Sequence, residues 1–282
     1  MLLQPLSILA LTLALLATLA SPAAAAPPSI YVRHEAVRAV DPIATSFFDA
    51  NHSASANLAT GSFRPLATTP AAQTLSSTGA GIESNLIITN NNAFPFTIWK
   101  GTLGAHFAGT YSVVPPGPSI DTGADSNVFL AVVTTGSTPT NYSVSLDHAL
   151  RTNGIPANDV NLVTPETTGG ASYVVTVASF TSFVGDLSMP TITLLPGQSM
   201  IIAFQIDAFA QRNSTADFFN TGGAQLHFDL PTGILLGTNS TVPLAWISVP
   251  EPARLETLVA GVAALMAFAK RRSLFATNVA GE

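Results

Sequence analysis

The sequence predicts an all-β sandwich for most of this 282-residue chain. Between residues 85 and 247, short apolar and β-branched runs recur, and clusters of Asn, Gly, Pro, Ser and Thr separate them. Several runs alternate with period two; Tyr142, Val144 and Leu146, for example, would point to one face of a sheet. The same segment contains no convincing amphipathic helix. Strands of this length between turn signals are typical of a sandwich or barrel.

The runs that we predict as strands of the body cover residues 86–89, 96–99, 111–114, 128–134, 142–146, 173–177, 191–195, 200–206 and 225–230. The preceding region, 26–82, is rich in Ala, Ser, Thr and Pro. We expect that region to be partly irregular, with a short strand at 30–32.

A weak internal repeat bears on the number of domains. The tetrapeptide P-G-P-S from Pro116 is echoed by P-G-Q-S from Pro196. The spacing between the two tetrapeptides is close to the length of one small sandwich. We therefore favour two tandem sandwiches, at 83–155 and 156–248, and keep one larger sandwich as the alternative. The opening L-I-I-T-N of the body, with P-G-x-S ahead of a strand, is similar to bacterial immunoglobulin-like surface modules. That resemblance implies an Ig-like sandwich.

Composition narrows the class of protein. Only 9% of the residues are charged and 47% are hydrophobic, whereas about 25% charged residues are usual in soluble domains. A net charge of −6 leaves no basic stripe for a polyanion, so nucleic acid is not an expected partner. The absence of cysteine excludes disulfides, thiolate catalysis and Cys-ligated zinc.

The N-terminus reads as an export signal. An apolar run at 6–19 is followed by Ser21-Pro22 and a stretch of alanines. This is the layout of a secretory signal peptide, which we place at 1–25 and which implies the Sec export machinery as a partner. The run is too short to span a bilayer comfortably.

The C-terminus reads as a short membrane helix. Residues 258–269 are all apolar or Gly, and Lys270, Arg271 and Arg272 follow. A helix over 257–269 covers only about 20 Å of a hydrocarbon core of about 30 Å, but flanking cationic side chains extend its reach. The basic residues would stay on the cytoplasmic side as a stop. We therefore expect an exported body and an internal tail.

Directly before this helix, Val249, Pro250, Glu251 and Pro252 form a V-P-E-P motif. The order of motif, short span and basic cluster at 249–282 resembles the PEP-CTERM sorting signal of Gram-negative bacteria. Two prolines keep the motif extended and accessible to a protease. An ordinary membrane anchor preceded by a Pro-rich linker is the alternative.

The resemblance implies a route and a location for the protein. Proteins with this signal are handled by exosortase, a membrane enzyme thought to cut near the motif, and they are associated with exopolysaccharide and biofilm matrices. The chain would then be anchored transiently in the inner membrane and end on the cell surface or outside the cell. The resemblance covers about the last tenth of the chain and implies nothing about the body.

One string in the body is similar to a catalytic motif. Residues 121–125 read D-T-G-A-D, like the active loop of retropepsin-type aspartic proteases, in which two carboxylates share a proton. The prolines just before it and the lack of a second such motif argue against this chemistry. We expect Asp121 and Asp125 to lie in an acidic turn or loop. A structural calcium ion on that loop is a further alternative.

The five histidines form no motif. His227 and Asp229 would share a solvated face of a strand, and His148 would point away from its neighbour Asp147. The other three, His34, His52 and His106, have no partner that the sequence identifies.

The sequence therefore predicts a non-enzymatic surface or matrix protein without a cofactor or metal. Hydrolase, nucleotide-binding and zinc-protease motifs are missing from it. One alternative is a carbohydrate-binding module, in which Trp99, Tyr111 or Trp246 would stack on sugars. The other is the secreted aspartic protease.

Overall fold

The computed structural model describes residues 27–34, 37–49, 51–70, 75–82, 86–91, 98–115, 121–136, 139–229 and 236–248. The predicted signal peptide and the whole C-terminal signal lie outside these ranges. Within them, no helix is long and apolar enough to cross a membrane.

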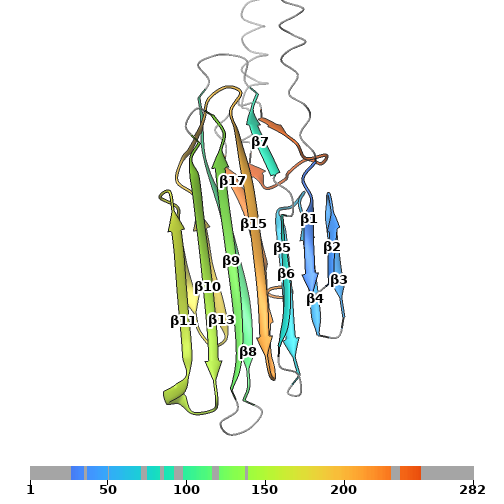
Figure 1. Cartoon of the computed structure of the whole chain (residues 1–282), viewed down its shortest axis with the longest axis vertical. Helices are drawn as coiled ribbons and strands as arrows, with labels where there is room; N and C mark the ends of the chain where they lie inside the picture. Colours follow the sequence, from blue (N-terminus) through green and yellow to red (C-terminus); the bar gives the residue numbers. More distant parts are fainter. Residues whose placement is uncertain are drawn as a thin grey trace, which may run out of the picture.

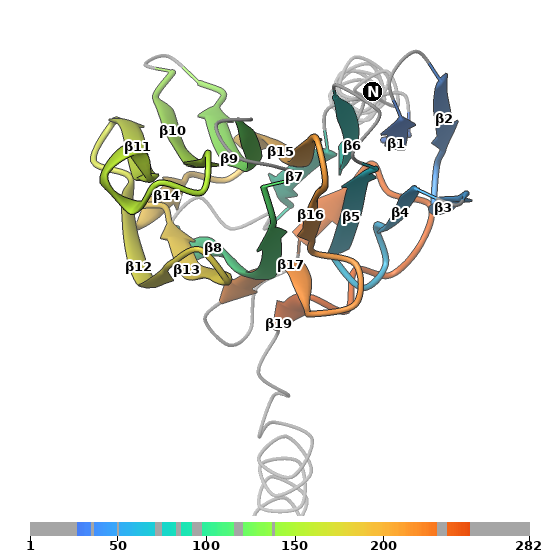
Figure 2. The same ribbon diagram turned by 90° about the horizontal axis from the view of Figure 1, so that it is seen from below.

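The described residues form two β-sheets that pack face to face, which Figure 2 shows as two layers. Sheet A has nine strands: β1 (Ile30–His34), β2 (Val37–Asp41), β6 (Ser76–Ile82), β7 (Leu86–Asn90), β9 (Thr122–Thr134), β10 (Asn141–Thr152), β11 (Val160–Thr168), β15 (Ser199–Gln211) and β18 (Leu236–Thr238). Sheet B has ten strands: β3 (Ala44–Phe48), β4 (His52–Asn57), β5 (Ser62–Thr69), β8 (Trp99–Val113), β12 (Ser172–Ala178), β13 (Ser182–Ser188), β14 (Ile192–Leu194), β16 (Ser214–Asp217), β17 (Gly223–Asp229) and β19 (Ile247–Ser248). A single 3-10 turn, η1 (Pro156–Asn158), links β10 to β11. For the described residues, the prediction of an all-β body built as a sandwich is therefore confirmed.

Each sheet is organised around one long strand. In sheet A, β15 pairs with β9 along its whole length, with β7 through its first residues and with β6 through its last. In sheet B, β8 pairs in turn with β14, β17, β13 and β16. The pairs are antiparallel, apart from β17 with β19. The two central strands come from different halves of the predicted body, one from each proposed repeat.

The described residues therefore form one sandwich rather than two in tandem. Each sheet contains strands from both 83–155 and 156–248, and strands from 27–82 complete both sheets. The second P-G-x-S marks a turn ahead of β15, where Gly197 has a positive φ of 78°. The first tetrapeptide, from Pro116, lies outside the described residues.

The N-terminal region is more regular than its composition predicts. It contributes β1 to β6, the blue and cyan strands on the right of Figure 1. In β4, Ala54 and Ala56 face the core while serines alternate with them toward the other side. The alternation with period two is present, but its buried apolar positions hold Ala and the positions between them hold Ser, so no large apolar residue marks the strand. Such strands pack because larger side chains on the facing sheet fill the space.

The core lies between the sheets and is dominated by phenylalanine. The rings of Phe63 on β5 and Phe204 on β15 lie 4.9 Å apart and connect the two sheets. Phe107 and Phe183 form a second pair at 4.8 Å within sheet B. These four side chains are almost completely buried. The chain passes between the sheets at both edges, through the β2–β3 and β11–β12 connections.

Candidate functional site

The predicted sorting motif at 249–252 and the basic cluster at 270–272 lie outside the described residues. The chain that leads to the motif is fixed to the sandwich. β19 pairs with β17, the indole Nε1 of Trp246 donates a hydrogen bond to the Leu58 carbonyl at 2.8 Å, and Trp246 is only 5% exposed. In the sequence, the motif begins at the residue that follows β19, the last of the described strands.

The expected acidic loop is a strand. Asp121 is exposed just before β9, but Asp125 lies within β9, which is paired on both sides. Asp125 accepts two hydrogen bonds from the Arg151 guanidinium on β10. Gly123 allows this pair, because a Cβ there would lie 2.6 Å from Cδ of Arg151. The D-T-G string is therefore part of a strand, in which Gly123 permits close packing against Arg151. The sequence did not indicate this, because Asp, Thr and Gly are also common turn residues.

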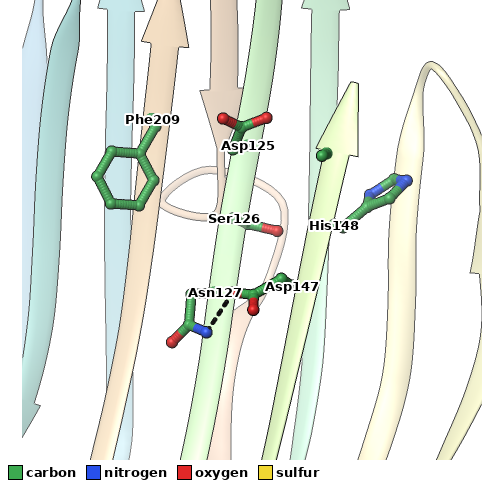
Figure 3. A pocket seen from close by; sticks show the side chains of 7 residues that line it. Asp125, Ser126, Asn127, Asp147, His148 and Phe209 are labelled. Atoms are coloured by element: carbon green, nitrogen blue, oxygen red, sulfur yellow. Dashed lines mark hydrogen bonds between the residues drawn. The ribbon is translucent and has the colours of Figure 1, made fainter. Parts of the chain in front are cut away.

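The outer face of sheet A is hollowed beside Asp125. A hollow of about 300 Å³ is lined by Asp125, Ser126, Asn127, Asp147, His148, Ala149 and Phe209. Figure 3 shows three strands contributing to it, with Asp125 and Asn127 on β9, Asp147 on β10 and Phe209 on β15. Asp125 stands between Ala149 and Phe209 in the strand register. The carboxylates and the amide could hydrogen-bond to hydroxyl groups of a ligand, and the aromatic ring beside them could contact an apolar face of it. The small residue Ala149 leaves room for such a ligand.

A row of polar groups extends from this hollow across the sheet. In the strand register, Asp147, Asn127, Asp207, Gly79 and Arg33 follow one another on β10, β9, β15, β6 and β1. The side-chain amide of Asn127 donates to Asp147, as the dashed line in Figure 3 marks. At the other end, Nη2 of Arg33 lies 2.6 Å from Oδ2 of Asp207. With strands about 4.8 Å apart, the row spans roughly 19 Å.

The carboxylate of Asp207 is almost completely buried, since the residue is only 3% exposed. Burial raises the pKa of its carboxyl above the ordinary value, although the Arg33 guanidinium and the Gln205 amide oppose the shift. Gly79 leaves the space in which Arg33 and Asp207 meet, because a Cβ there would lie 2.0 Å from Oδ1 of Asp207. Residues so far apart in sequence gave no motif to find.

A buried polar chain supports the hollow from beneath. Within the core, His148 contacts the Tyr111 hydroxyl at 3.2 Å and the Asn161 side-chain oxygen at 2.8 Å, and Tyr111 is hydrogen-bonded to Ser126. Burial lowers the pKa of His148 and raises that of Tyr111, so both stay neutral at pH 7. This chain connects β8 of sheet B to β9 and β10 of sheet A. It fixes the strands whose alternate residues line the hollow.

The aromatic residues expected to stack on sugars are not available for it. Tyr111 and Trp246 are 6% and 5% exposed, with their polar atoms hydrogen-bonded inside the protein. The side chain of Trp99 is not among those that the structure describes. Phe209, which the sequence did not single out, is the aromatic residue that lines the hollow. Its placement depends on the register of β15 with β9.

The histidine predictions are partly confirmed. Asp147 is exposed while His148 is fully buried, as alternation predicted. His227 and Asp229 are both exposed on β17, with Phe228 buried between them, which also agrees with the prediction.

The three histidines for which the sequence identifies no partner each have one in the structure. His106 pairs with Asp186 on β13 at 2.9 Å. His34 and His52 meet each other and Asp49. A sequence signal for the second group existed, because in β1 and β4 both histidines share the inward phase of the apolar residues. It requires the strands and their facing to be known.

No family model, curated protein or solved structure matches this chain.

Proposed function

We propose that this protein is an exported, non-enzymatic component of the cell surface or of an exopolysaccharide matrix, sorted by its C-terminus. The observation that carries the proposal is the order of elements at the end of the chain. A body that is closed by β19 is followed at once by V-P-E-P, an apolar segment and a basic cluster. The export signal at the other end supports the same direction of transfer.

The geometry before the motif suits processing. Ser248 ends β19, so a cut at Val249 to Pro252 would remove none of the strands that form the sandwich. Trp246 packs against the body and would keep the new C-terminus attached to it. We therefore infer that exosortase releases an intact sandwich from the inner membrane, with 257–269 as the predicted membrane helix. The likeness to Ig-like surface modules is part of this proposal, and two antiparallel sheets support it.

A Glu251→Ala variant tests this proposal in a host that has an exosortase. The wild-type protein should lose its C-terminal segment and appear outside the inner membrane, whereas the variant should keep its full mass in the membrane fraction. An Asp229→Ala variant, altered at an exposed position of β17, should be processed like the wild type. Retention of 253–282 in all three proteins would refute sorting by this motif.

A second function, binding of matrix polysaccharide, is favoured by the outer face of sheet A. The hollow with Phe209 and the polar row from Asp147 toward Arg33 offer one apolar ring and several hydrogen-bonding groups in a line. Such a face suits an extended chain of sugars, whose hydroxyls and ring faces alternate.

Binding of the purified protein to the host exopolysaccharide tests the second function. Asp147→Ala and Phe209→Ala should each weaken binding by about 1 kcal/mol or more, because each removes a direct contact. The control, His227→Ala on the outer face of sheet B, should bind like the wild type. Equal binding by all variants would exclude this face as the binding surface.

A further inference from the structure

Two histidines and one aspartate meet at the N-terminal edge of the sandwich. His34 is the last residue of β1 in sheet A, His52 is the first residue of β4 in sheet B, and Asp49 precedes β4 in the turn after β3. The two imidazole rings are stacked, with centroids 3.6 Å apart and planes inclined by 20°. The cluster therefore joins the two sheets, whose strands β1 and β4 face each other in Figure 2.

Both imidazoles present a nitrogen to the same carboxylate. Nδ1 of His52 lies 3.0 Å from Oδ1 and 3.1 Å from Oδ2 of Asp49. Nε2 of His34 lies 3.3 Å from Oδ2 of Asp49. Stacking therefore places both nitrogens beside one carboxylate, and because the lone pair of an imidazole nitrogen lies in its ring plane, one ring has to rotate for both nitrogens to bind one ion.

These separations match the edges of a coordination polyhedron. In a tetrahedral zinc site with bonds of about 2.0–2.1 Å, neighbouring ligand atoms are roughly 3.3 Å apart. One ligand atom from each of the three residues lies within 4.8 Å of the other two. Rotation of one ring and small side-chain shifts would bring these three atoms to bonding distance from a single ion.

The aspartate is already oriented for this role. Oδ1 of Asp49 accepts hydrogen bonds from the backbone N–H groups of Asn51 and His52, both at 2.7 Å. The other oxygen, Oδ2, receives no backbone hydrogen bond among the described residues, so it is the oxygen available to an ion.

A second observation points to a bound species in this corner. In the part of the chain that the structure describes, four buried side-chain atoms have no hydrogen-bond partner: Nδ1 of His34, Nε2 of His52, Oγ of Ser76 and Oγ1 of Thr78. Thr78 is directly opposite His34 in the β1–β6 register, and Ser76 lies two residues before it on the same face. Buried polar atoms without protein partners commonly mark ordered water or an ion with its surrounding shell.

We propose that His34, Asp49 and His52 form a binding site for a transition-metal dication of the zinc class. Two imidazole nitrogens and one carboxylate oxygen are ligands that zinc accepts, whereas calcium and magnesium prefer oxygen alone. The Asp49 side chain is 37% exposed, so the ion has an entry path and a coordination position open to solvent. Because the ligands come from both sheets, the ion fastens β1 to the β3–β4 hairpin.

Zinc binding to the full-length chain, purified without a polyhistidine tag and stripped with a chelator, tests this site. Calorimetry with zinc chloride should give one ion per wild-type chain, and cobalt(II) should give the visible spectrum of a low-coordinate site with nitrogen ligands. His34→Gln and His52→Gln should each raise the zinc Kd by more than about 100-fold, because loss of an outer-shell partner alone costs roughly 10- to 100-fold.

His106→Gln is the matched control. His106 also lies 2.9 Å from an aspartate, but that pair contains one histidine and is exposed. This variant should bind zinc like the wild type. If His52→Gln fails to fold, Asp49→Asn gives the same test, because asparagine keeps the Oδ1 acceptor of the turn but loses the charged ligand.

Circular dichroism of the metal-free proteins establishes that each variant is folded before binding is compared. Lack of zinc binding by the wild type, unchanged binding in the cluster variants, or loss in His106→Gln would each overturn the proposal. The cluster would then be a hydrogen-bonded group only.

Discussion

Replacement of Arg33 by methionine removes the counter-ion of a buried carboxylate while it keeps an apolar stem over Gly79. Asp207 is 3% exposed and depends on Arg33 and Gln205 for its side-chain hydrogen bonds. Loss of one partner of a buried ion pair typically costs 3–5 kcal/mol. Because the Arg33 side chain is 41% exposed, water already screens part of the interaction, and we expect about 2–3 kcal/mol at pH 7.

The same variant should change the dependence of stability on pH. Burial raises the pKa of Asp207 above 3.8 in the folded protein. The folded state therefore binds this proton more tightly than the unfolded state, so the ionised carboxyl costs stability at neutral pH. That cost is relieved as pH falls through the raised pKa. Without Arg33 the pKa rises further, and the stability deficit of the variant should shrink as the solution is acidified toward pH 5.

Urea denaturation followed by circular dichroism at pH 7 and pH 5 measures both effects. Asp207→Asn in the Arg33→Met background should restore most of the lost stability, since no buried charge remains. Arg38→Met is the control: it removes the same charge from β2, where Arg38 lies 4.4 Å from the centre of the Tyr31 ring, and should cost about 0.5–1 kcal/mol. A loss below about 0.5 kcal/mol for Arg33→Met, or no rescue by Asp207→Asn, would refute the reasoning.

Three further predictions follow from burial and close contacts. Burial raises the pKa of Tyr31 to about 12 from 10.0, so the stability due to this group should be intact below pH 10 and should be lost as pH rises toward 12; the ultraviolet absorbance of the phenolate reports the titration. Gly61→Ala should cost about 2–4 kcal/mol in urea denaturation, because Gly61 has a φ of 68° and a new Cβ would lie 2.7 Å from the Trp246 ring. Phe204→Ala should cost about 3–5 kcal/mol by the same assay, because it opens a cavity against Phe63; a loss under about 1 kcal/mol would show that this core is not packed as described.

The sequence predicted strands well where large residues alternate. The runs at 128–134, 142–146 and 200–206 lie inside β9, β10 and β15, since each carries apolar residues at every second position. It predicted β4 and β5 poorly, because their inward residues include Ala54 and Ala67, which are also common in irregular segments. It misread D-T-G-A-D, since the glycine there serves contact with Arg151 rather than a turn.

The candidate sites show the same division. The opposite directions of Asp147 and His148 followed from period two alone. The approach of Phe209 to Asp125 required the β9–β15 register, and that of His34 to His52 required the facing of two sheets. No local pattern reports such distances.

The sequence by itself determined that the body is β-rich and that its strands have a buried and an exposed face. The two ends of the sequence also carry the prediction of export and sorting. These properties are local, because periodicity, short motifs and hydrophobic length act within about twenty residues. Only the tertiary structure decided that three stretches of the chain interleave in one sandwich. It also placed Asp147, Asn127, Asp207 and Arg33 in one row, and it brought Asp49 between two histidines. Strand order and register depend on the free energy of the whole packed core, in which residues far apart in sequence contribute together.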